Sequence, residues 1–283
     1  MVKTIISNIP ITRNPEIEFE IEGRLLKGLE ARREKGLFLS PVVLQAENGR
    51  GYLGFSAIGT PACALWYSLK GYEPMEEDPG SRLGFDTGHL LETYVLDLMG
   101  ATSRQKEVGL EWPGTPGGRI LGHIDGLLDL PELPGAVVLE CKATGGYSFS
   151  KKEEEGPDPG HVAQAFCYAA LLKSHALSII YMNREAKKAT SLFKVFAFTL
   201  DERNAGKGLQ ALLEARFSPV LEGLRKDKRP EPPQEPKWEF GPRGWRCRPD
   251  RQFKARGRLQ RQVGYCSYRH ICPEARKYAA ETA

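Results

Sequence analysis

The chain has 283 residues, and its 40 Lys and Arg against 36 Asp and Glu give a formal net charge of +4. A hydrophobic content of 41% beside 27% charged residues is typical of a chain that buries a core, which excludes a disordered protein. Six cysteines are too few for a disulfide scaffold, and the modest net charge does not by itself indicate a nucleic-acid binder.

The sequence shows neither the pattern of a membrane-spanning helix nor that of an export signal. No stretch approaches the ~18 consecutive apolar residues of a membrane-spanning helix, and residues 1–10 lack the pattern of an export signal. We therefore expect a cytoplasmic protein without a membrane partner. Its thiols should stay reduced and serve as core residues, metal ligands or catalytic groups.

The N-terminal third predicts one strand and three helices. Residues 17–21 alternate apolar and acidic side chains, which predicts an edge strand, and residues 24–35 predict a charged surface helix. Thr60 and Pro61 form a start signal for a helix that runs to residue 69. An apolar stripe at helical spacing predicts a further helix over residues 85–99.

The middle of the chain predicts a hairpin. Residues 120–130 and 136–142 have the composition of strands, and the intervening residues 131–135 are turn material. A turn at this place sets a register in which positions that sum to about 266 face each other. Residues 144–160 are rich in Gly, Ser and charge, which predicts a loop.

The rest predicts more regular structure and then a stiff connector. The patterns indicate a helix over 160–173, strands over 178–182 and 192–200, and a long helix over 201–226 capped by Asp201. Residues 229–242 are Pro-rich and predict an extended linker, followed by a tail over 243–277 that carries +9. The other residues then carry about −5.

The hairpin carries the residues with the clearest chemistry. Glu140 and Lys142 are two apart on one strand and share a face, and the register places Asp125 nearly opposite Glu140. Paired carboxylates attract a hard divalent cation, and a lysine beside them can polarise water, which suits phosphodiester hydrolysis. The alternative is a cross-strand ion pair on a solvated face, which the apolar neighbours of Glu140 make less favourable.

These residues resemble the core of the PD-(D/E)XK nuclease superfamily. The segment Gly88-His89-Leu90-Leu91-Glu92 is similar to an upstream helical motif of its RecB-like exonuclease branch, and Gln164-Ala165-Phe166-Cys167-Tyr168 is similar to its Gln-x3-Tyr motif. The sequence departs from the superfamily's motif at Ile124, since that motif has a proline before the aspartate.

The resemblance implies an α/β fold: a restriction-endonuclease-like central mixed sheet, flanked by helices, with a helical iron–sulfur appendage built from both chain ends. It implies three regions, namely residues 1–80 with the first cluster cysteine, the nuclease core over 81–228, and the linker and cluster-binding tail over 229–283. The implied activity is that of an Mg²⁺- or Mn²⁺-dependent DNA nuclease, above all an exonuclease on single-stranded ends.

The resemblance also implies roles for individual residues. Asp125 and Glu140 would bind the cation, helped by His89 and the main-chain carbonyl of Cys141, and Lys142 would activate water. Gln164 and Tyr168 would support Lys142 and the substrate. Two further residues are candidates for contacting the substrate, Glu92 and His161, the latter on the helix face of Gln164 and Tyr168.

The cysteines divide into two groups. Cys141 and Cys167 lie in apolar segments and are expected in the core. The other four, Cys63, Cys247, Cys266 and Cys272, are similar to the cysteine set of the iron–sulfur members of the branch, although eighteen residues separate Cys247 from Cys266 here. Four thiolates suit a [4Fe–4S] cluster, with structural zinc as the less favoured alternative.

The basic tail predicts contacts with DNA phosphates, and the candidates are Arg248, Arg251, Lys254 and Arg256. Two other classes of function stay open, a nucleic-acid-binding module with a vestigial nuclease site and a zinc-stapled adaptor protein. The sequence does not decide the oligomeric state, a ring-forming homo-oligomer included.

Overall fold

The structure is a computed structural model, and it describes residues 9–35, 52–74, 79–131, 133–230, 268 and 270–273. Its strands are β1 (Ile11–Arg13), β2 (Leu53–Gly54), β3 (Glu107–Glu111), β4 (Arg119–His123), β5 (Gly126–Leu128), β6 (Val137–Thr144), β7 (Ala176–Asn183) and β8 (Phe193–Leu200). Its α-helices are α2 (Pro15–Lys35), α3 (Ala62–Leu69), α4 (Pro79–Met99), α5 (Gly146–Glu155), α6 (Pro159–Leu172) and α7 (Glu202–Arg225). Short 3₁₀ turns are η1 (Phe55–Gly59), η2 (Pro116–Gly118) and η3 (Ala189–Ser191).

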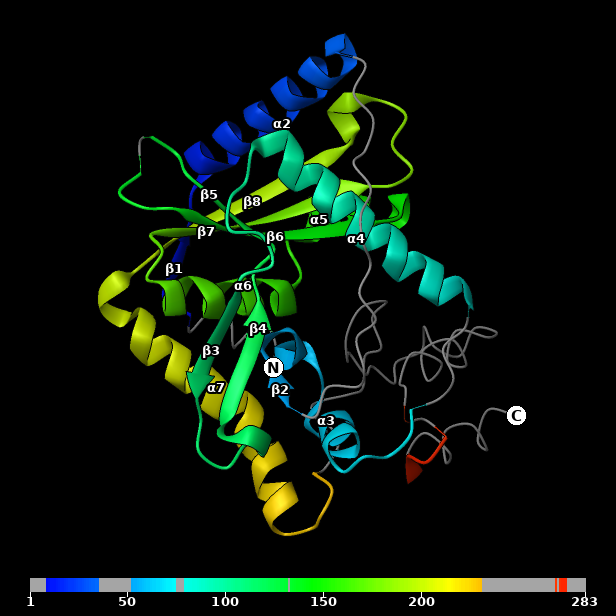
Figure 1. Ribbon diagram of the computed structural model, residues 1–283, viewed down its shortest axis with the longest axis vertical. Coiled ribbons are helices and arrows are strands. Elements are labelled where there is room, and N and C mark those ends of the chain that lie inside the picture. The colour runs from blue at the N-terminus through cyan, green and yellow to red at the C-terminus, as the bar shows by residue number, and fades with distance from the viewer. Residues whose placement is uncertain are drawn as a thin grey trace.

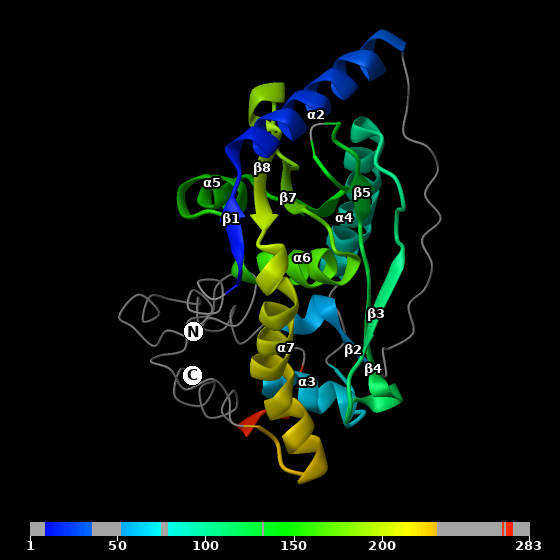
Figure 2. The same cartoon turned by 90° about the vertical axis from the view of Figure 1, so that its left-hand side faces the viewer.

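The fold is α/β with a central mixed sheet, as predicted. Its five strands have the order β1-β8-β7-β6-β5, in which β6 and β7 are parallel and the other pairs antiparallel. Figure 1 shows α2 and α4 on one side of this sheet and α6 on the other, with α7 beyond α6. A second sheet of order β2-β4-β3 lies beside α6, as the perpendicular view in Figure 2 also shows.

Side chains of β6 divide between the two cores because successive side chains of a strand point to opposite faces. Val137, Leu139 and Cys141 are buried with α2 and α4, whereas Val138 is buried with α6 and α7. Glu140 and the other even-numbered positions of β6 therefore face the α6 side of the sheet. No helix in the described ranges is both long and apolar enough to span a membrane.

The prediction of a strand over residues 17–21 is wrong, because these residues lie within α2. The side chain of Asn14 accepts hydrogen bonds from the N–H groups of Glu16 and Ile17, both at 3.1 Å, and so caps the helix. Ile17 and Ile21 are buried against the sheet at a spacing of one helical turn. Glu18, between them, is buried as well, because its Oε1 accepts from the N–H of Ala197 on β8 at 3.1 Å and its two oxygens bind Arg13 at 2.7 and 2.9 Å.

The single strand predicted over 120–130 is divided in the structure. The chain leaves the second sheet after His123, at the end of β4, and enters the central sheet at Gly126, the start of β5. Between them, the N–H of Ile124 donates to the carbonyl of Lys106 at 3.1 Å, which extends the antiparallel pairing of β4 to the residue before β3. Asp125 thus lies at the crossing between two sheets.

The loop predicted over 144–160 contains α5. Phe149 is buried at 2% exposure and anchors the helix, while Lys151 and Glu155 pair at 3.5 Å one helical turn apart. The elements predicted over 60–69, 136–142, 160–173, 178–182, 192–200 and 201–226 are confirmed with changes of one or two residues at their ends, and the helix predicted over 85–99 is confirmed but begins six residues earlier, at Pro79. The linker predicted over 229–242 lies outside the described residues from residue 231 on. The cap of α7 is also confirmed, since Asp201 accepts from the N–H of Arg203 at 3.1 Å.

Candidate active site

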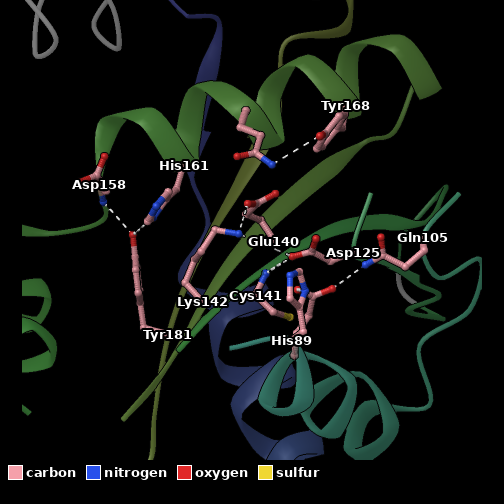
Figure 3. Close-up of polar contacts among 12 residues, drawn as sticks. His89, Gln105, Asp125, Glu140, Cys141, Lys142, Asp158, His161, Tyr168 and Tyr181 are labelled. Carbon is pink, nitrogen blue, oxygen red and sulfur yellow. Dashed lines mark hydrogen bonds and ion pairs between the residues drawn. The ribbon is translucent and has the colours of Figure 1, made fainter. Parts of the chain in front are cut away.

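Asp125 is held at the crossing by the strand beside it. Gly126 pairs with Leu139, so the observed register sums to 265 and brings Asp125 opposite Glu140, close to the prediction. The N–H of Cys141 donates to Asp125 Oδ2 at 2.6 Å, and the aspartate is only 6% exposed. Figure 3 shows this carboxylate turned toward β6.

Glu140 and Lys142 point to the same side of β6. Lys142 Nζ lies 2.5 Å from Glu140 Oε1 and 4.0 Å from Asp125 Oδ2. Glu140 has no exposed surface, and its Oε2 has no hydrogen-bond partner within the described part of the chain. Burying a carboxylate oxygen without a hydrogen-bond donor costs free energy. Glu140 Oε2 is therefore a candidate for binding a group from outside the protein, such as a cation.

Helix α4 brings two more titratable groups to this place. Glu92 and His89 are one turn apart, with His89 Nδ1 3.9 Å from Glu92 Oε2. The other oxygen of Glu92, Oε1, accepts a hydrogen bond from Gln105 Nε2 at 2.6 Å. The imidazole of His89 is largely exposed, whereas Glu92 is largely covered.

The carboxylates of this cluster are hard to ionise. Burial, increased by repulsion from Asp125, raises the pKa of Glu140 to about 8 against the attraction of Lys142. Burial and the charge of Asp125 likewise raise the pKa of Glu92 to about 8, and burial raises the pKa of Asp125. Burial alone would lower the pKa of Lys142, but the charges of Glu140 and Asp125 raise it above its ordinary value.

Helix α6 covers the cluster with the predicted Gln164 and Tyr168. Gln164 Nε2 donates to the hydroxyl of Tyr168 at 3.4 Å, and both side chains are buried. Burial and then the charge of Glu140 raise the pKa of Tyr168. Gly122 makes room for this tyrosine, since a Cβ at residue 122 would lie 2.6 Å from the hydroxyl. Tyr168 also packs edge-on against Phe55, with ring centroids 5.6 Å apart.

The start of α6 is tied to β7 next to Lys142. Tyr181 stands opposite Lys142 in the parallel pairing and is fully buried. Its hydroxyl accepts from the N–H of Asp158 at 2.8 Å and lies 2.9 Å from Nδ1 of the predicted His161 (Figure 3).

The arrangement fits a hard divalent cation in the chemistry of its donors. Among the described residues, no group of three or more His, Cys, Asp or Glu side chains is already arranged to hold a metal ion. Nevertheless, Asp125, Glu140 and Glu92 act on one another electrostatically, and Glu140 has a buried oxygen without a donor. Oxygen-rich sites of this kind suit Mg²⁺ or Mn²⁺, whose charge would relieve the repulsion.

The predicted cysteine site is described in part. Cys63 on α3 and Cys272 of the tail are both buried, and Cys272 packs in one cluster with Trp66, Tyr67 and Tyr268. The rings of Tyr67 and Tyr268 stack with centroids 5.4 Å apart, so the tail returns to α3. Two predicted ligands, Cys247 and Cys266, and the candidate phosphate-binding residues Arg248, Arg251, Lys254 and Arg256 lie outside the described residues.

The sequence did not indicate three residues of this neighbourhood. Gln105 lies in the connection between α4 and β3, where no motif marks it. Tyr181 and Asp158 became visible only through the pairing of β6 with β7 and the position of α6. Cys141 and Cys167 are buried in the core, as predicted.

Comparisons with known proteins found distant structural likenesses. No protein-family model and no curated protein matches the chain. A solved structure named SSO0001 matches at a TM-score of 0.43 and 15% identity, over 90% of this chain and 96% of the other. The structure of an alkaline exonuclease from Laribacter hongkongensis matches at a TM-score of 0.36 and 17% identity, over 62% of this chain and 93% of the other. The structure of a phage-related exonuclease from Haemophilus somnus matches at a TM-score of 0.43 and 12% identity, over 62% of this chain and 95% of the other. All three TM-scores are below 0.5.

Proposed function

We propose that this protein is a metal-dependent DNA nuclease whose active site is built around Asp125, Glu140 and Lys142. The observation that carries the proposal is the contact of one ammonium group with two buried carboxylates, 2.5 Å from Glu140 and 4.0 Å from Asp125. A solvated surface ion pair, the alternative that the sequence left open, does not account for a fully buried Glu140. The presence of all three groups supports an active enzyme over a vestigial site.

Asp125 and Glu140 would hold Mg²⁺ or Mn²⁺, with His89 and the Cys141 carbonyl as further ligands. The bound cation supplies a Lewis acid that lowers the pKa of water and neutralises charge on the phosphate. The chain contributes fixed geometry: the N–H of Cys141 orients Asp125 Oδ2, and the pairing of β5 with β6 sets the spacing of the two carboxylates.

Lys142 acts as a donor. Its pKa lies above the ordinary value because Glu140 and Asp125 are close, so it keeps its proton at neutral pH. A protonated Nζ can orient the attacking water and stabilise negative charge that develops on the phosphate, but it cannot take a proton from water. Gln164 and Tyr168 would cover the cluster from α6, and His161 and Glu92 would contact the substrate.

The substrate class that we propose is DNA, with single-stranded ends preferred. Support comes from the charge pattern, since the tail over 243–277 carries +9 while the rest carries about −5. Lysine and arginine side chains neutralise phosphates without reading sequence.

Product analysis tests this activity. DNA labelled at the 5′ or 3′ end, single- or double-stranded, is incubated with Mg²⁺ or Mn²⁺ beside a closed single-stranded circle. We expect mononucleotides or short products from the linear DNA, little attack on the circle, and loss of cleavage in Asp125→Ala. Equal digestion by wild type and Asp125→Ala would show that the activity does not belong to this site.

We further propose a structural [4Fe–4S] cluster held by Cys63, Cys247, Cys266 and Cys272. The burial of Cys63 and Cys272, together with the packing of the tail on α3, supports a staple between the two chain ends. Such a staple closes a long segment of chain and should stabilise both ends. Anaerobically purified protein should be brown and contain iron and sulfide, whereas a colourless protein with stoichiometric zinc would contradict the cluster.

A further inference from the structure

The connection between α4 and β3 forms a bracket around the candidate site. Thr102 and Leu127 exchange two main-chain hydrogen bonds of 2.7 and 2.8 Å, and the N–H of Ile124 donates to Lys106 at 3.1 Å. Between these anchors the N–H of Gln105 lies 3.4 Å from the carbonyl oxygen of Asp125. The segment that carries Gln105 is therefore fixed to the residues on both sides of Asp125.

The backbone of this bracket has an uncommon conformation. Ser103 and Gln105 have φ values of +48° and +51°, in the left-handed region, although neither is glycine. This conformation costs roughly 1 kcal/mol for an ordinary residue, and such costs are tolerated where the surroundings hold the chain in place. At residue 105 it accompanies a side chain that reaches across to α4.

The Gln105 side chain binds one oxygen of Glu92, a carboxyl group that interacts electrostatically with Asp125 and Glu140. Gln105 Nε2 donates to Oε1 at 2.6 Å, whereas Oε2 lies 3.9 Å from His89 Nδ1. The amide is neutral, so it fixes the carboxylate without cancelling its charge as a lysine would. Because Gln105 is exposed, this bond contributes little to the stability of the fold.

We infer that Gln105 is a positioning residue, which holds Glu92 toward Asp125 and Glu140 so that this carboxylate faces the divalent cation of the site. The inference rests on the proposed metal-dependent nuclease activity. Gln105 connects two parts of the site. Its main-chain N–H lies next to the carbonyl of Asp125, and its side-chain amide binds Glu92 on α4. Groups that orient the carboxylates of a metal site typically change metal affinity or activity by about 10- to 100-fold when they are lost.

The test is Gln105→Met, which keeps the length of the side chain and removes the donor. The matched control is Gln210→Met, because Gln210 makes the same kind of bond to Glu214, at 3.0 Å on α7. Mn²⁺ binding is measured by calorimetry with the metal alone, and the Mn²⁺ dependence of DNA cleavage is measured beside it.

We expect Gln105→Met to bind Mn²⁺ about tenfold more weakly and to need correspondingly more Mn²⁺ for half-maximal cleavage, with kcat at saturating Mn²⁺ near the wild-type value. Gln210→Met should match the wild type in both. Wild-type affinity in Gln105→Met overturns the positioning role and leaves the metal site intact. If wild type and Asp125→Asn bind Mn²⁺ equally poorly, the proposed function itself fails, and the inference fails with it.

Discussion

Mn²⁺ binding should depend strongly on pH, because two carboxyl groups of the proposed cation site, Glu140 and Glu92, hold protons at neutral pH. The pKa values of Glu140 and Glu92 are both raised to about 8 by burial and by neighbouring carboxylates. A cation that binds the ionised oxygens must displace these protons, so the apparent affinity rises as the pH rises. The perturbation is simply a change from pH 6 to pH 8.

The magnitude follows from the raised pKa. A carboxyl group with a pKa of about 8 is about 99% protonated at pH 6 and about half protonated at pH 8. Displacement of one such proton therefore makes binding at pH 8 about 50-fold tighter than at pH 6, and a second displaced proton from Glu92 would increase the ratio further. A glutamate with its ordinary pKa would give almost no change over this range.

Calorimetry of the wild type in pairs of buffers with different ionisation enthalpies gives both the affinity and the number of protons released. We expect release of about one proton or more at pH 6. Glu140→Gln should release fewer protons than the wild type. An affinity that changes less than about threefold between pH 6 and pH 8 would refute the reasoning, because the carboxylates would then already be ionised.

Three further predictions concern the fold around the site. In the metal-free native protein Glu140 keeps its proton up to about pH 8, whereas in the unfolded chain it loses the proton near the ordinary pKa of a glutamate. The free energy of unfolding should therefore fall as the pH rises between these two values. Urea titrations should show a smaller decline in Glu140→Gln, and equal slopes would contradict the burial effect. Tyr181→Phe leaves the N–H of Asp158 without its acceptor and should cost about 1–3 kcal/mol in urea unfolding, so a cost below ~0.5 kcal/mol would argue against this contact. Gly122→Ala brings a Cβ to 2.6 Å from the Tyr168 hydroxyl and should cost about 1–3 kcal/mol, part of which Tyr168→Phe recovers in the double variant. Strictly additive costs would show that the two residues do not meet.

The pairing of Asp125 with Glu140 could be predicted because it depends on local information. A turn of fixed length between two apolar segments sets the register, and side chains two apart share a face. The Gln164–Tyr168 pair could be placed on one helix face for the same reason. Helix periodicity also predicted most of α4, α6 and α7, with small errors at the ends.

The errors arose where the local pattern was ambiguous or tertiary contacts decided the structure. Ile17 and Ile21 alternate with acidic residues in a way that fits a strand, but they are also one helical turn apart, and Asn14 caps the helix. The break at Asp125 depends on the second sheet, whose β2 and β3 come from distant segments. Gln105 had no signal, because its role depends on how the chain crosses from α4 to β3.

The proposed role of Lys142 and its carboxylate partners in DNA hydrolysis is tested most directly by one measurement. Nucleotide release from labelled single-stranded DNA is followed at saturating Mn²⁺ for wild type and for Lys142→Met, purified side by side, with and without chelator. We predict release by the wild type, none with chelator, and a rate about 10²- to 10⁴-fold lower in Lys142→Met, because the donor to water and phosphate is lost. No release by the wild type, or equal release by both proteins, would contradict the account.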